Sequence, residues 1–149
     1  MRMKTRLRRV LAVAATAAAL SSAVIAPTVA HADGGPVITT NGTICWEKGG
    51  QPAVTVQLSE VAKDAVTVVV DTFDGTAVAP DDYTAIKSLL VTIPAGASSV
   101  QVPLTIAADG IVEPDEWFFV SLSKPSIGKI GKNPATVIIK DGPQPAAAK

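Results

Sequence analysis

The chain has 149 residues, which suits one domain of ordinary size, and its 13 basic residues formally balance its 13 acidic ones. With one cysteine and one histidine, it offers neither an intramolecular disulfide nor a multi-histidine metal site. Only 4% of the residues are aromatic, which is few for a sugar-binding cleft.

The first segment is typical of a secretory signal peptide. A basic head, Arg2 to Arg9, precedes the small apolar run Val10–Ala26, and Ala30-His31-Ala32 supplies a small-x-small cleavage pattern. A transmembrane anchor is the competing interpretation, but the run is at the short end for a bilayer and is interrupted by polar residues. We therefore predict a signal peptide over residues 1–32, a secreted, extracellular protein, and no membrane insertion after cleavage.

Cleavage changes the charge of the chain. Five basic residues and no acidic ones leave with the leader, so 8 basic and 13 acidic residues remain, a net charge of −5. This acidic balance argues against nucleic acid or an anionic membrane as a partner. His31 also leaves, so no Ser-His or Cys-His pair can form, and we predict that the protein is not an enzyme. Paired carboxylates in a glycosidase are the remaining catalytic alternative, which the scarcity of aromatic residues disfavours.

The mature sequence reads as strands throughout. Period-2 alternation rich in β-branched residues predicts half-buried strands. After a first strand within Val37–Cys45, these lie at Ala53–Ser59, Val66–Thr72, Leu89–Ile93, Val100–Ile106, Phe118–Leu122 and Val137–Ile139. Pro103 indicates an edge position or a bulge. We expect an all-β fold over residues 33–141, a seven-stranded antiparallel β-sandwich with an immunoglobulin-like Greek key, and a disordered tail over residues 142–149.

The acidic residues gather at one end of such a fold. If consecutive strands alternate in direction, the loops before Ala53, after Thr72 and after Ile106, and the end of the last strand, share that end. It then holds nine acidic residues: Glu47, Asp74, Asp81, Asp82, Asp109, Glu113, Asp115, Glu116 and Asp141. Carboxylates so placed repel one another unless a cation lies among them. Oxygen ligands without imidazole or thiolate suit calcium, although acidic surface loops also cluster by chance.

Five motifs in order resemble the Calx-beta domain family over about Thr43–Asp141. They are Glu47-Lys-Gly-Gly50 with the strand Ala53–Ser59, Thr72-Phe-Asp-Gly-Thr-Ala77 with Asp82-Tyr83, Ile93-Pro-Ala-Gly96 with the strand to Ile106, the segment Asp109–Ser123, and Ala135-Thr-Val-Ile-Ile-Lys-Asp141.

The resemblance implies a sandwich that holds calcium in the loops at one end. The ligands it implies are the side chains of Glu47, Asp82, Asp109, Glu113, Glu116 and Asp141 and the carbonyl of Ile111. Asp74 is better interpreted as a turn former before Gly75. Calcium-binding members often have further acids where this chain has Ala108 and, after Asp141, Gly142-Pro143. Fewer charged ligands predict one or two ions bound weakly, at about 10⁻⁴ to 10⁻³ M.

Two functions follow from this resemblance. One is a secreted calcium-binding module for binding or adhesion, in which the ion rigidifies the loops that contact an unknown protein or surface ligand. The other is a structural or interaction domain with a vestigial calcium site. For Cys45, a buried small hydrophobe is the plainer interpretation, and a dimer linked through Cys45 is the alternative.

Overall fold

The protein is described by a computed structural model that covers residues 34–143, 145 and 146. The predicted signal peptide and half of the predicted tail lie outside these residues, so both stay predictions. Among the described residues, no helix is long and apolar enough to cross a membrane.

The described residues form nine strands and no helix. In chain order they are β1 (Val37–Thr40), β2 (Thr43–Lys48), β3 (Ala53–Leu58), β4 (Val66–Asp74), β5 (Leu89–Ile93), β6 (Ser99–Pro103), β7 (Glu116–Ser123), β8 (Lys129–Ile130) and β9 (Ala135–Pro143). The last strand ends two residues beyond the domain boundary expected at Asp141, because Pro143 still pairs with Lys48 of β2.

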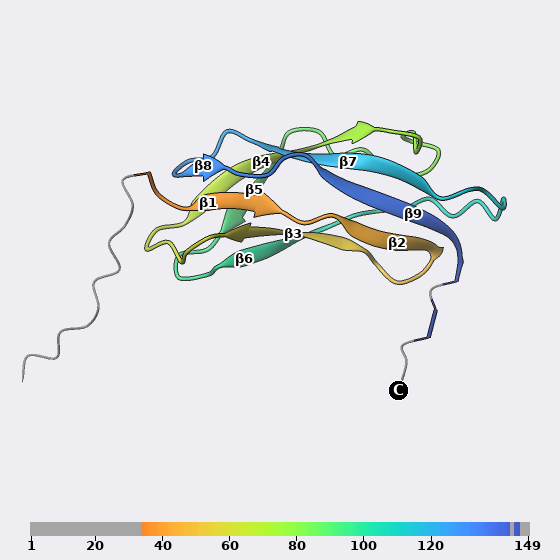
Figure 1. The fold of residues 1–149 in the computed structure, drawn as a ribbon, viewed down its shortest axis with the longest axis horizontal. Coiled ribbons are helices and arrows are strands. Elements are labelled where there is room, and N and C mark those ends of the chain that lie inside the picture. The colour runs from red at the N-terminus through yellow and green to blue at the C-terminus, as the bar shows by residue number, and fades with distance from the viewer. Residues whose placement is uncertain (1–33, 144, 147–149) are drawn as a thin grey trace, which may run out of the picture. The chain divides into compact units, whose positions relative to one another are not determined.

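The strands form two sheets packed face to face (Figure 1). One sheet has four strands in the order β6-β3-β1-β8, and the other has five in the order β2-β9-β7-β4-β5. The all-β sandwich is therefore confirmed, and Pro103 lies on an edge strand, β6, as predicted. Two strand pairs, β1 with β8 and β2 with β9, are parallel rather than antiparallel.

The strand count exceeds the predicted seven at two places. The expected first strand is divided, since β1 pairs with β3 in one sheet and β2 pairs with β9 in the other. The chain changes sheets at Asn41-Gly42, where a side chain on Gly42 would collide with the carbonyl oxygen of Thr136. The second addition is β8, which has only two residues and lies in a stretch rich in turn formers. The remaining six strands lie where the alternation predicts them.

The core lies between the sheets and is built by alternate residues of each strand. In β4, Val66, Val68 and Val70 are fully buried, whereas their neighbours in the strand are partly exposed. This is the period of two that places successive side chains on opposite faces. Fully burying a valine is worth about 1.5–3 kcal/mol, so these positions fix which face of the strand is turned inward.

Two aromatic rings close the core beneath one end of the sandwich. Tyr83 and Phe118 are almost completely buried, and their rings stack with centroids 3.9 Å apart at 7°. Burial raises the pKa of Tyr83 to about 12, and its hydrogen bond to Asp74 contributes. Tyr83 also bridges to Ile106, which ties the β4–β5 loop to the segment after β6.

Candidate metal centre

Three acidic residues of the five-stranded sheet continue the core-facing side of their strands. Glu47 follows buried Cys45 by two positions in β2, Asp141 follows Ile139 in β9, and Glu116 precedes Phe118 in β7. Since β2, β9 and β7 are neighbours in the sheet, the carboxylates lie above the end of the core. Sequence reasoning placed them at this end of the fold but missed that they lie on the inner face, a relation visible in their two-residue spacing from apolar neighbours.

An irregularity in strand pairing lies beside Glu47 and Asp141. Trp46 pairs with Lys140, but Lys48 pairs with Pro143, so β9 has one more residue than β2 over this stretch. Gly142 accommodates the insertion with a φ of +88°, in the left-handed region that favours glycine. Such a bulge changes the direction of side chains at a strand end. Gly142 therefore has a backbone role at this end of β9.

Residues of two loops, β4–β5 and β6–β7, complete the carboxylate cluster. Asp82 is positioned by a turn in which its amide donates to the carbonyl oxygen of Val78 (3.0 Å) and its Oδ2 accepts from the amide of Val78 (2.7 Å). Ligand oxygens of Asp82, Glu113 and Glu116 all lie within 4.8 Å of one another. With Glu47, Asp109 and Asp141, these residues make up what we call the acidic pole.

The pKa of Glu47 responds to acidic residues on both a neighbouring strand and a loop. Burial raises the pKa of Glu47, and the negative charges of Asp141, Asp109 and Glu113 raise it further, against a lowering by Lys48. These charges act at short range, so the four carboxylates belong to one cluster. Glu47 Oε2 and Asp141 Oδ1 are each buried without a hydrogen-bond partner among the described residues.

Glu116 shows the same effect from the other side of the cluster. Burial raises its pKa first, followed by the charges of Asp82 and Glu113, a hydrogen bond with Asp82, and the charge of Glu47. Glu113 thus raises the pKa of both Glu47 and Glu116 and lies between the two halves of the acidic pole. The structure thus brings Asp82, Glu113 and Glu116 within 4.8 Å of one another, and the charges of Asp109, Glu113 and Asp141 act on Glu47; that the six residues bind an ion stays a prediction.

Asp109 and Ile111 lie on the β6–β7 loop. Asp109 Oδ1 accepts a hydrogen bond from the amide of Ile111 (2.7 Å), across Gly110 with a φ of +80°. This small turn holds Ile111 beside Asp109, and the role of the Ile111 carbonyl as a ligand stays a prediction. The side chain of Ile111 is exposed.

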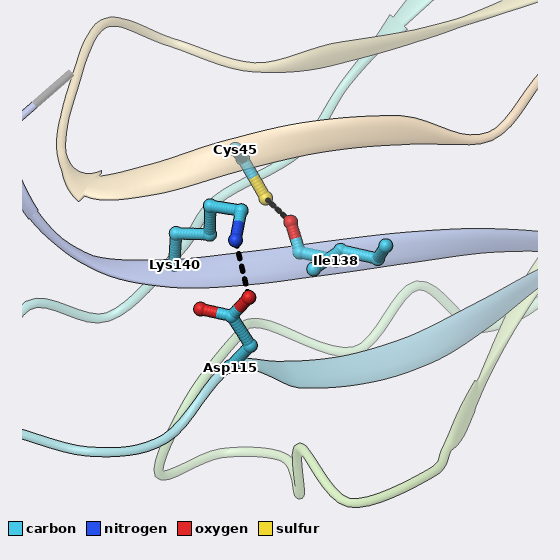
Figure 2. A network of polar contacts seen from close by, with 4 residues as sticks. All are labelled: Cys45, Asp115, Ile138 and Lys140. Atoms are coloured by element: carbon cyan, nitrogen blue, oxygen red, sulfur yellow. Dashed lines mark hydrogen bonds and ion pairs between the residues drawn. The ribbon is translucent and has the colours of Figure 1, made fainter. Parts of the chain in front are cut away.

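Two further acids at this end have structural partners. Asp74 Oδ1 accepts from the hydroxyl of Tyr83 (2.6 Å) and the amide of Ala79 (3.1 Å), and these bonds lower its pKa. Asp74 is thus a loop former, as expected, but it braces the segment that carries Asp82 and not only the turn at Gly75. Asp115 forms an ion pair with Lys140, which sequence reasoning did not single out (Figure 2).

Cys45 lies beside this end but faces the core. The residue is 3% exposed, and its thiol donates a hydrogen bond to the backbone carbonyl of Ile138 (3.2 Å; Figure 2). Burial raises its pKa to about 11, so it stays a thiol at neutral pH and is a poor metal ligand and nucleophile. An intermolecular disulfide would require β2 to separate from β9.

The chemistry of the acidic pole is that of a hard-cation site. Its ligand atoms are oxygens from several strands and loops, and the two buried oxygens without partners are groups that a cation satisfies. Oxygen donors in this number and without nitrogen or sulfur suit calcium. The residues present therefore fit a calcium ion.

The fold and the acidic pole together define an immunoglobulin-like β-sandwich module with a carboxylate cluster at one end. The chain belongs to the Calx-beta domain family, which matches residues 37–143. Calx-beta domains bind calcium and are typically non-catalytic, and no catalytic family was found. A comparison with curated proteins gave no match.

Solved structures of Calx domains are similar to this chain. The apo form of the Calx CBD1 domain is 28% identical with a TM-score of 0.63, and the match covers 71% of this chain and 98% of that one. The calcium-binding domain CBD12 of CALX1.1 is 26% identical with a TM-score of 0.64, covering 70% of this chain and 44% of that one. The Calx CBD2 domain, 16% identical over 74% of this chain and 90% of that one with a TM-score of 0.64, shares the fold.

Proposed function

We propose that the protein is a secreted binding module whose acidic pole holds calcium. The observation that carries the proposal is the pair of buried oxygens without partners, Glu47 Oε2 and Asp141 Oδ1, within a cluster of mutually repelling carboxylates. A buried carboxylate oxygen is unfavourable unless it is hydrogen-bonded or binds a cation. Calcium supplies the positive charge that these groups lack.

The ligands in this proposal are the side chains of the acidic pole and the carbonyl of Ile111. Glu113 lies between the halves at Glu47 and Glu116, so the cluster suits one or two ions. With Ala108 and Gly142 in place of family acids, we expect binding at about 10⁻⁴ to 10⁻³ M, the range of extracellular modules. Such an affinity is sufficient where calcium is millimolar, which agrees with the secretion signal predicted over residues 1–32.

The proposed role of the ion is to rigidify the loops that contact a partner. The β4–β5 and β6–β7 loops supply Asp82, Asp109 and Glu113, whereas Glu47, Glu116 and Asp141 belong to strands. An ion shared between them would fasten the loops to the sheet. The proposed partner is a protein or surface ligand outside the cell.

Thermal unfolding tests the calcium proposal. After chelation, a few millimolar calcium should raise the unfolding midpoint by several degrees, and magnesium should not. At about 3 to 30 times Kd, the gain is about 0.8–2 kcal/mol. Asp109→Asn and Glu116→Gln should each reduce this gain. Glu60→Gln, in the β3–β4 connection, is the control and should leave it unchanged.

An unchanged midpoint in wild-type protein would favour the second candidate, a structural or interaction domain with a vestigial site. Ala108 and Gly142 are the observations behind that alternative, since each removes a charge from the family pattern.

Secretion is tested separately. Protein recovered from the culture medium should begin at Asp33 when its N-terminus is sequenced. An intact N-terminus on protein retained with the cell membrane would support the anchor interpretation instead.

A further inference from the structure

The two outer faces of the sandwich differ in character. On the four-stranded sheet, the outward positions carry mainly small or polar side chains, among them Thr39, Thr55, Gln57 and Gln101. This is the usual state of a sheet with one face in the core and one in water. The five-stranded sheet departs from it.

The outward positions of the five-stranded sheet hold several large apolar residues on neighbouring strands. Strand register places Ile44 opposite Ile138, Ile138 opposite Trp117, and Phe119 opposite Phe73. On the edge strand, Leu90 lies opposite Val69 on the same face. We call this surface the apolar outer face, defined by Ile44, Phe73, Leu90, Trp117, Phe119 and Ile138.

Four of these six residues are exposed, and Phe119 and Ile138 are partly buried. Ile44 and Phe73 are each 55% exposed, and Leu90 is 63% exposed. Single exposed apolar residues are ordinary, but a contiguous group across neighbouring strands marks an interaction surface. Trp117 lies against Gly75, where any added side chain would collide with the indole, so the ring is held in place on the sheet.

Each charged group on this face makes a contact within the same chain. Lys140 pairs with Asp115, Asp71 Oδ1 accepts from the amide of Ser88 (2.7 Å), and Lys87 Nζ lies over the Phe73 ring, 5.9 Å from its centroid. The other outward positions between the apolar residues are serines and threonines, such as Ser121 and Thr136. The face is therefore compatible with a second surface of the same kind.

The size of the face matches what a dimer needs. Five strands about 4.8 Å apart make it about 24 Å wide, and the eight residues of β7 span about 25 Å. Two such faces in contact bury about 1,200 Å², the lower end of the range for specific protein interfaces. Face-to-face packing of two sheets is also how this domain builds its own core.

We propose that the apolar outer face binds a second copy of this chain, forming a two-fold symmetric dimer by sheet-on-sheet packing. A two-fold axis lying over Phe73 and Phe119 brings the apolar residues of one copy against those of the other. The small interface predicts a reversible dimer that dissociates on dilution. It forms independently of the acidic pole, so it does not require calcium.

Analytical ultracentrifugation in reductant, which removes any Cys45 disulfide, tests the proposal. At about 100 μM, the protein should sediment with twice the mass of one chain, with chelator or with calcium, and it should become monomeric below about 1 μM. Ile44→Ser/Phe73→Ser should be monomeric at both concentrations while retaining its circular dichroism spectrum. Val61→Ser/Ile127→Ser is the matched control, because these residues are similarly exposed (53% and 42%) at the end of the domain that holds the β3–β4 connection. It should dimerise like wild type.

Two outcomes would overturn the proposal. One is wild-type protein that is monomeric at about 100 μM; if it were then retarded in a gel containing a soluble glucan, the face would be a sugar-binding surface instead. The other is a folded Ile44→Ser/Phe73→Ser variant that still dimerises. Should that variant fail to fold, iodide quenching of wild-type tryptophan decides the question, since it should increase on dilution if Trp117 lies in the interface and stay constant if it does not.

Discussion

At the scale of single residues, the acidic pole combines two opposing requirements. Its carboxylates must be close enough to share a cation, and without one their burial, and then their closeness, raise the pKa of Glu47 and Glu116. The same side chains are therefore expected to destabilise the fold without calcium and to stabilise it with calcium.

Glu116→Gln separates the two effects. In chelator, the variant should unfold at a higher temperature than wild type, because an amide removes the repulsion from Asp82 and Glu113. In a few millimolar calcium the order should reverse, because a ligand is lost. Differential scanning calorimetry of both proteins under both conditions measures this crossover. The contradicting result is a variant that is less stable than wild type in chelator as well.

The residues also show what sequence can and cannot provide. Strand alternation and a count of directions were sufficient to gather Glu47, Asp82, Asp109, Glu113, Glu116 and Asp141 at one end, because antiparallel connections leave little freedom. The partners of Asp115 and Asp74 were missed, because an ion pair with Lys140 and a hydrogen bond from Tyr83 depend on the register between β7 and β9 and on loop packing. Alternation within a single strand carries no information about register.

At the scale of elements, the main departure from expectation is the division of the first strand. The turn-forming dipeptide Asn41-Gly42 interrupts the alternation between Val37 and Cys45, but a turn signal does not reveal a change of sheet; the close approach of Gly42 to Thr136 accompanies the crossing there. The short strand β8 could not be predicted from the sequence, because a two-residue parallel pairing leaves no alternation pattern in a stretch of turn formers.

Gly42→Ala should therefore destabilise the fold by about 1–3 kcal/mol, the usual effect of forcing an extra methyl group into a packed site. Its Cβ would meet the carbonyl oxygen of Thr136 in β9, which can move only with the strand. Gly50→Ala is the control, because nothing lies within 4 Å of its added methyl group. Urea unfolding of the three proteins measures the difference; equal midpoints for Gly42→Ala and wild type would refute the steric explanation.

At the scale of the whole molecule, the acidic pole should make stability depend on pH in the direction opposite to most acidic proteins. The pKa values of Glu47 and Glu116 are raised above the ordinary value of 4.5, so between 4.5 and those raised values the folded state binds more protons than the unfolded state. Stability then increases as the pH falls through that window and decreases as it rises. Asp74, whose pKa is lowered from 3.8, acts the other way only below that value.

In chelator, the unfolding midpoint should thus rise as the pH is lowered from 7 toward about 4.5. In saturating calcium it should fall over the same range, because protons compete with the ion for the carboxylates. Thermal melts at several pH values with and without calcium check both directions. If the midpoint in chelator instead falls steadily as the pH is lowered from 7, carboxylate repulsion in the acidic pole does not contribute significantly to the free energy of unfolding.

The parallel pairing of β2 with β9 has a mechanical consequence. These strands come from opposite ends of the domain and run in the same direction, so tension that pulls the chain before β1 away from the chain after β9 slides one strand along the other. Five register pairs, from Thr43–Val137 to Lys48–Pro143, then bear the load together instead of opening one at a time. Glu47 lies in β2 and Asp141 in β9, so an ion held by both would link the two strands and oppose their sliding. The module would resist stretching most strongly in the medium that supplies the ion.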